Sequence, residues 1–116
     1  MSVVYLEPNT QTNKIKGSAI FEMSEIADKD GAGNTIMLPD ESGKIDSILV
    51  ALNVNGGTAR VEWSLSPRSV LKAGGGNWQA WGAGNVAVDA SDVFYPVSAV
   101  RMFVLSGNPV LEVVAV

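Results

Sequence analysis

The chain has 116 residues, of which 47% are hydrophobic, and a formal net charge of −4 at pH 7, as is typical of one soluble globular domain. It contains neither cysteine nor histidine, which excludes disulfide bonds, thiolate metal sites, a cysteine nucleophile and a histidine general base. The acidic balance and the scattered basic residues argue against a nucleic-acid partner. The lack of a long apolar run argues against a signal peptide or a membrane partner, so we expect synthesis in the cytoplasm.

Residues 1–17 combine a short apolar run with Pro8 and a polar stretch, NTQTNKIKG. This pattern fits an edge strand followed by a loop, and it also fits an extended arm that reaches a neighbouring subunit. We expect residues 18–116 to form a single domain. The apolar side chains through which the arm would contact a neighbour are Val3, Val4, Tyr5 and Leu6.

Residues 18–27, SAIFEMSEIA, fit either a strand or a short helix. As a strand they place Phe21 and Met23 on one face and Glu22 and Ser24 on the other. We favour the strand because the stretch is short and the rest of the chain has the pattern of β-structure.

Residues 28–34, DKDGAGN, form a turn that partly matches a calcium-binding loop. Asp28 and Asp30 have the spacing of two ligands, but Ala32 and Pro39 stand where further oxygen ligands are required. An Asp/Gly/Asn turn explains the segment, so we expect no metal and no cofactor.

Residues 44–66 predict a β-hairpin around which the rest of the chain is organised. The first arm, residues 45–54, is almost continuously apolar. Asn55-Gly56-Gly57 follows, and these residues accept positive φ at little cost. The second arm, residues 59–65, alternates between apolar and polar side chains. Those expected on its inner face are Val61, Trp63 and Leu65.

Shorter strands are expected at residues 35–38, 77–81 and 86–88. Residues 69–73 give no clear prediction, and residues 89–96, with Tyr95, are expected to form a loop. On a strand, Trp78 and Trp81 would face opposite sides. We therefore expect one of these tryptophans in the core and the other at a surface.

The C-terminal part predicts a second hairpin, with arms at residues 97–105 and 110–116. Each arm carries one charged residue, Arg101 and Glu112. A cross-strand ion pair between them is expected to contribute about 0.2–1 kcal/mol.

Eight or nine short strands separated by Gly, Asn, Asp and Pro turns, with no convincing helix, predict an all-β protein: a β-sandwich or jelly roll of about eight short antiparallel strands with an N-terminal extended arm. Residues 45–54 and 97–105 have more apolar side chains than one inner face needs. We expect some of them to face a partner, in a homo-oligomer (dimer or trimer) or on a larger assembly. The side chains in question are Ile48, Val50, Leu52, Val54, Val100, Met102 and Val104.

Three segments carry a resemblance to a known class: GKIDSILVALNVNGGTARVEWSLSP, NWQAWGAGN and VSAVRMFVLSGNPVLEVVAV. In their turns and alternation, residues 43–116 resemble small β-sandwich proteins encoded among bacteriophage structural genes, such as capsid decoration or cement proteins. The resemblance implies a structural virion protein, assembled in the host cytoplasm, with the major capsid protein or other virion subunits as partners. A head–tail or tail subunit belongs to the same class.

A carbohydrate- or receptor-binding module is the alternative. Its aromatic platform would consist of Trp78, Trp81 and Tyr95, edged by Asn77 and Gln79. An enzyme is not expected, because no base, nucleophile and orienting group converge in the sequence. We therefore expect no catalytic, cofactor-binding or metal-binding residues. The candidate interface residues are Val3, Val4, Tyr5, Leu6, Ile48, Val50, Leu52, Trp78, Trp81 and Tyr95.

Overall fold

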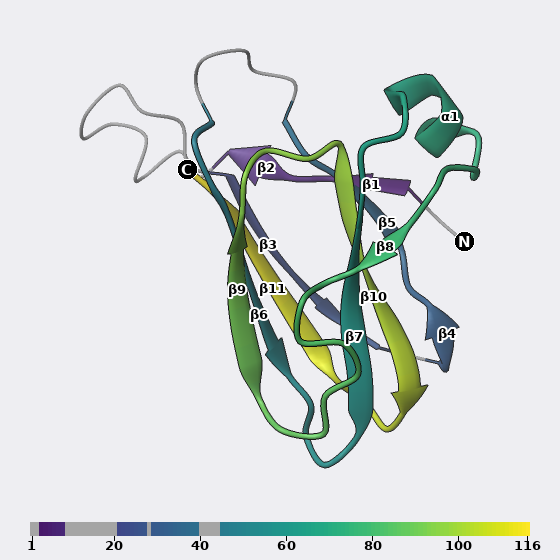
Figure 1. Cartoon of the computed structure of the whole chain (residues 1–116), viewed down its shortest axis with the longest axis vertical. Coiled ribbons are helices and arrows are strands. Elements are labelled where there is room, and N and C mark those ends of the chain that lie inside the picture. The colour runs from purple at the N-terminus through teal and green to yellow at the C-terminus, as the bar shows by residue number, and fades with distance from the viewer. Residues whose placement is uncertain (1–2, 9–20, 28, 40–44) are drawn as a thin grey trace.

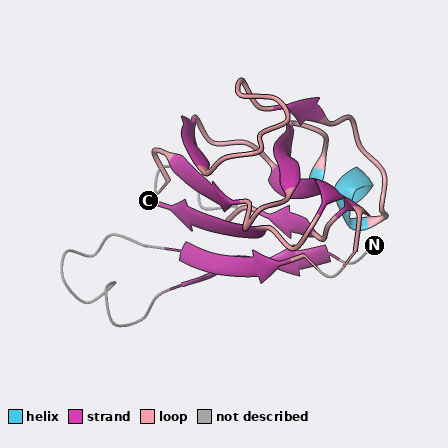
Figure 2. Cartoon of the chain, turned by 90° about the horizontal axis from the view of Figure 1, so that it is seen from below, coloured by secondary structure: helices cyan, strands magenta, loops and turns pink. Residues whose placement is uncertain are grey.

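Two β-sheets pack face to face around a hydrophobic core, which confirms the expected all-β sandwich (Figure 1, Figure 2). This computed structural model describes residues 3–8, 21–27, 29–39 and 45–116. We call the six-stranded sheet the first sheet and the five-stranded sheet the second sheet.

Each sheet is built from strands that are far apart in the sequence. In spatial order, the first sheet contains β1 (Val3–Tyr5), β5 (Thr35–Met37), β10 (Ala99–Ser106), β7 (Thr58–Ser64) and β8 (Gln79–Ala80), and β4 (Gly31–Ala32) also pairs with β10. The second sheet contains β2 (Glu7–Pro8), β3 (Phe21–Ile26), β11 (Val110–Ala115), β6 (Ile48–Asn53) and β9 (Ala90–Phe94). The pairing of β1 with β5 is parallel, in contrast to the expected antiparallel arrangement.

One short helix, α1 (Arg68–Lys72), lies at the same end of the molecule as β1 (Figure 1). Pro67 stands at its N-terminal boundary with φ −55°, and its carbonyl oxygen accepts hydrogen bonds from the backbone N–H groups of Val70 and Leu71. Leu71 is buried in a small cluster with Met37 and Ala99. The expectation of no helix is therefore wrong for this segment, whose residues 69–73 gave no clear prediction.

Alternation along β6 decides which of its side chains enter the core. Ile48, Val50 and Leu52 are buried, whereas Leu49 and Asn53 are exposed. The expectation that Ile48, Val50 or Leu52 faces a partner is therefore wrong, because the second sheet directs all three onto the first sheet. The other side chains considered for the same role are also buried: Val54, Val100, Met102 and Val104.

The expected hairpin over residues 44–66 is wrong, because β6 and β7 lie in different sheets. Asn55 and Gly56 have φ values of 50° and 82°, and the N–H of Gly57 donates to the carbonyl oxygen of Val54 at 2.7 Å. The turn chemistry is as expected, but the chain crosses between layers. A hairpin would place both apolar faces on the same side of one sheet, whereas this crossing makes them face each other across the core.

The prediction of a C-terminal hairpin is wrong for the same reason, since β10 belongs to the first sheet and β11 to the second. The expected ion pair between Arg101 and Glu112 is also wrong, because the two residues lie on different sheets. The register of β10 and β7 places Arg101 opposite Glu62 instead.

Some of the remaining strand predictions are confirmed, and others are wrong. β3 and β5 confirm the strands expected at residues 18–27, as far as these are described, and at residues 35–38. In residues 86–88 only Val86 pairs, through an isolated bridge with Ala59. The paired strand is β9, inside the expected loop, where the polar Ser91 and Asp92 concealed it from the sequence.

Residues 3–8 form edge strands, with β1 at an edge of the first sheet and β2 at an edge of the second. For this part of the chain the edge-strand interpretation therefore fits, while residues 9–17 lie outside the described residues. Tyr5 is exposed and Leu6 is buried, so only Tyr5 offers a large surface. Val3 and Val4 are half-buried against the sandwich.

Candidate binding surfaces

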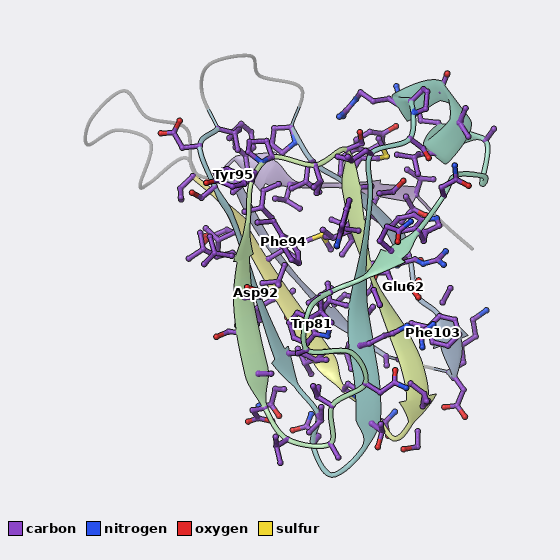
Figure 3. All side chains as sticks on the ribbon, in the orientation of Figure 1. Glu62, Trp81, Asp92, Phe94, Tyr95 and Phe103 are labelled. Carbon is purple, nitrogen blue, oxygen red and sulfur yellow. The ribbon has the colours of Figure 1, made fainter. Side chains whose placement is uncertain are left out.

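Glu62 stands between two arginines on the outer face of the first sheet (Figure 3). Its Oε2 atom lies 2.7 Å from Nη2 of Arg60, and its Oε1 atom lies 2.7 Å from Nε of Arg101. Glu62 itself is buried. A carboxylate with a guanidinium on each side is stabilised despite its burial.

Aromatic rings cover the same two arginines. The guanidinium of Arg60 lies 4.1 Å from the ring centroid of Phe103, and that of Arg101 lies 4.2 Å from the ring of Trp78. Each arginine thus has both a carboxylate and an aromatic partner. We interpret this layer as structural, because its charges are already paired within the chain.

An apolar row crosses the outer face of the second sheet. Val114 on β11 lies opposite Leu49 on β6, and Leu49 lies opposite Val93 on β9. Leu49 is 40% exposed and Val93 is 59% exposed. A shallow hollow covers this region. The outward-facing side chains that line it are Leu49, Ala51, Ser91, Val93, Glu112 and Val114.

Glu112 lies near the middle of this outer face. The register places it between Ser24 on β3 and Ala51 on β6, in the central strand β11. Its side chain is exposed. Any partner that covers the apolar row also covers this carboxylate.

The charged residues of the described elements are divided between the two sheets. Strands β3, β6, β9 and β11 of the second sheet contain carboxylates and no basic residue: Glu22, Glu25, Asp92 and Glu112. Strands β7 and β10 with helix α1 contain mainly basic residues: Arg60, Arg68, Lys72 and Arg101, against Glu62. Of these four carboxylates, Glu22 and Glu112 lie on the outer face of the second sheet, whereas Glu25 and Asp92 alternate with them and point to the other face.

β8 and β9 form the edges of their sheets on the same side of the sandwich (Figure 1). Two hollows of about 500 and 460 Å³ adjoin there and share Trp63 and Leu65. We call this pair of hollows the lateral cleft. Toward β8 it is lined by Ser66, Pro67, Asn77 and Gln79. Toward β9 it is lined by Gly82, Asp92, Val93, Phe94, Tyr95, Pro96 and Val97.

The register of the edge strands explains how the lateral cleft is built. Trp63 lies opposite Gln79 in the pairing of β7 with β8, so the two side chains share one face. Trp63 is half-buried against the core and forms the floor. Phe94 points from β9 toward β7, and Tyr95 lies at the end of β9 with 89% of its surface exposed (Figure 3).

Several polar groups of the cleft have no partner among the described residues. The indole N–H of Trp63 and the side-chain amides of Asn77 and Gln79 make no hydrogen bond in the described part of the chain. The Oγ atom of Ser66 accepts a 2.8 Å hydrogen bond from the backbone N–H of Asn77, which fixes this wall of the cleft. Free donors and acceptors thus surround an aromatic floor.

The aromatic platform expected from the sequence is not assembled. Trp81 is only 2% exposed, and its indole N–H donates to the carbonyl oxygen of Gly84 at 2.6 Å. Trp78 is half-buried between Arg101 and the small cluster around Leu71. The expectation of one core tryptophan is confirmed for Trp81. Of the expected platform, only Tyr95, Asn77 and Gln79 line the lateral cleft.

The sequence interpretation missed Trp63 as a surface residue because alternation assigned it to the core. Leu65, expected on the inner face, is 65% exposed beyond the end of β7. Leu49 and Val114 face outward because side chains alternate along a strand and their neighbours are buried. The period-2 pattern of the sequence could therefore have predicted their outward position.

The described residues contain no group of three or more carboxylates that could hold a metal ion. Among the same residues, no helix is long and apolar enough to cross a membrane. A scan against protein-family models gives no match, and searches of curated proteins and of solved structures find no similar protein.

Proposed function

We propose that this chain is a non-enzymatic structural protein of a phage virion, a capsid decoration or cement subunit that acts through protein–protein contacts. The resemblance of residues 43–116 to small phage β-sandwich proteins supports this class. The single observation that carries the binding role is the apolar row across the second sheet, in which Leu49 and Val93 are exposed and Val114 is half-buried. Exposed apolar patches of this kind mark contact surfaces in soluble proteins.

Glu112 defines the chemistry of the partner. A surface that covers the apolar row also removes this carboxylate from water, and an unpaired buried charge is strongly destabilising. The partner therefore presents an apolar surface with a lysine or arginine opposite Glu112. We propose the major capsid protein, or another virion subunit in the case of a head–tail or tail protein, as the source of that surface.

Two copies of the chain are poorly suited to pair symmetrically through this face. A two-fold contact through this face buries Glu112 of both copies, and strands β3, β6, β9 and β11 carry no basic residue to pair with it. A homo-oligomer, which remains part of the proposal, uses a different surface.

Decoration stabilises a shell by mass action. The subunit binds a surface that exists only in the assembled shell, so each bound copy favours the assembled state. No catalytic step is required, because binding to the assembled surface is itself what stabilises the shell.

The experiment is a binding assay with expanded, undecorated heads of the phage that encodes the chain. The unmodified protein is expected to cosediment with the heads, and Glu112→Lys is expected to bind at least about tenfold more weakly, because it opposes a cation with a cation. Asp30→Lys makes the same charge change at an exposed turn residue and is the matched control.

Equal binding of the Glu112→Lys and Asp30→Lys variants would contradict the assigned surface. Absence of binding to heads by the unmodified protein, with binding to purified tails, would move the protein from the capsid to the tail.

A further inference from the structure

The lateral cleft has the aromatic surfaces that a sugar ring requires. Trp63 is held in place because it is half-buried against the core, and Tyr95 stands almost fully exposed at the other side. The C–H faces of sugar rings are apolar and pack on aromatic rings, and such rigid rings lose little entropy when they bind.

The unpaired polar groups of the cleft distinguish its ligand from an apolar protein segment. The indole N–H of Trp63 and the amides of Asn77 and Gln79 are free among the described residues. An apolar partner that covered them would strip their water without replacing the hydrogen bonds, which is costly. A ligand rich in hydroxyl groups supplies both hydrogen-bond donors and acceptors. Each side-chain amide can match it, because the amide NH₂ group donates and the amide oxygen accepts.

The charge of the lateral cleft further limits the class of ligand that can bind there. Asp92 is the only charged residue that lines either hollow, among the residues described, and no basic residue is present. Its Oδ1 atom already accepts a 2.8 Å hydrogen bond from the backbone N–H of Val93. A phosphorylated, sulfated or sialylated ligand finds no counter-charge here and meets a carboxylate instead.

We propose that the lateral cleft is a binding site for a neutral saccharide, with Trp63 and Tyr95 as the aromatic surfaces and Asn77 and Gln79 as the hydrogen-bonding groups. The two hollows have the size of ordinary small-molecule sites. This site goes beyond the proposed virion role, because it depends on the opening between β8 and β9 and not on Glu112 or the outer apolar row. It gives the protein a second surface, suited to a glycan.

The test is a titration of the ¹⁵N-labelled full chain, followed by NMR. The probes are the neutral oligosaccharides cellotetraose, maltotetraose and mannotetraose, with sialyllactose as the charged probe. The chain has three tryptophans, so the indole N–H signals can be followed one by one. At least one neutral probe is expected to shift the signals of the Trp63 indole and of the Asn77 and Gln79 amides. The Trp81 indole, bonded to Gly84, is the internal reference and is expected to stay in place.

The double variant Asn77→Ala/Gln79→Ala removes both amides at exposed positions and is expected to bind the same probe at least about tenfold more weakly. Asn53→Ala removes an exposed amide that lines neither hollow and whose Oδ1 accepts a hydrogen bond from the backbone N–H of Asn55, and it is expected to bind normally. The proposal is overturned if no neutral probe shifts the Trp63 indole at about 10 mM, a concentration well above the range of weak specific binding. Equal affinity of the double variant and Asn53→Ala overturns it too, as does tighter binding of sialyllactose than of every neutral probe.

Discussion

The three tryptophans show how much one residue type depends on its surroundings. Trp81 is buried in the core with its N–H bonded, Trp78 is half-buried against Arg101, and Trp63 is half-buried with its N–H free. Buried aromatic area stabilises a fold, while exposed aromatic area with an unbonded polar tip is available to a ligand. One residue type thus serves the core, the surface layer and the cleft.

The different burial of these side chains predicts different losses of stability. Trp81→Ala is expected to lower the free energy of unfolding by about 3–5 kcal/mol, because it leaves a large cavity and removes the bond to Gly84. Trp63→Ala is expected to cost about half as much, because the side chain is only partly buried. Urea unfolding of both variants measures the difference. A larger loss for Trp63→Ala would show that the cleft floor is part of the core.

At the scale of elements, the two crossings between the sheets meet at one end of the molecule. A Cβ atom on Gly107 would lie 2.8 Å from the Cα of Gly57, and a Cβ on Gly57 would meet the carbonyl oxygen of Ser106. The side-chain amide of Asn55 also donates to the carbonyl oxygen of Asn108 at 3.1 Å. The turns between β6 and β7 and between β10 and β11 are therefore packed backbone to backbone.

This contact predicts that Gly57→Ala lowers the free energy of unfolding by about 2–3 kcal/mol, because the added methyl group meets backbone that cannot move aside cheaply. Gly82→Ala is the control. No heavy atom lies within 4 Å of its added Cβ, so its unfolding free energy is expected to stay within about 0.5 kcal/mol of the original. Thermal or urea unfolding compares them. Similar stabilities for the two variants would mean that the crossings are not tightly packed.

The elements also mark the limit of what the sequence could predict. Alternation in residues 18–27 predicted β3 and its faces, and turn chemistry predicted positive φ at Asn55 and Gly56. The sheet to which a strand belongs was not predictable, because the same Asn-Gly turn can connect two strands of one sheet or two strands in different sheets. The outcome depends on pairing with strands that are distant in the sequence, such as β11, and a local sequence pattern cannot predict that pairing.

The candidate sites were predictable to a smaller degree. Tyr95, Asn77 and Gln79 were expected near an aromatic surface, and all three line the lateral cleft. Trp63 was not, because its place at an open side of the sandwich follows from the short edge strand β8, which pairs through two residues only. The expected outward residues of β6 were wrong by one position, and such a shift exchanges the two faces of a strand.

At the scale of the whole molecule, the sandwich separates its surfaces by chemistry. The outer face of the second sheet carries an apolar row beside Glu112, the first sheet carries paired arginines, and the open side between them is aromatic with one carboxylate, Asp92. Such a division allows one small domain to contact different partners on different sides.

This division predicts opposite results for two adjacent substitutions on β6. Leu49→Asp is expected to leave the fold intact, within about 1 kcal/mol, because the side chain already faces water, and to abolish binding to phage heads, because it lies on the proposed contact surface. Val50→Asp is expected to unfold the protein, because it places an unpaired charge in the core. Circular dichroism and head cosedimentation measure the two effects. Unfolding by Leu49→Asp, or normal head binding by it, would contradict the assigned contact face.

The central positions of β10 and β11 have a consequence for biosynthesis. β10 joins β4, β5 and β7, and β11 joins β3 to β6, so neither sheet is complete without a strand near the C-terminal end of the sequence. In the second sheet, β3 pairs with β2 and β6 pairs with β9, but these two halves cannot join before residues 110–115 are synthesised. Folding of the sandwich is therefore dominated by pairings between strands that are far apart in the sequence, which slows folding and leaves apolar strands exposed in the meantime.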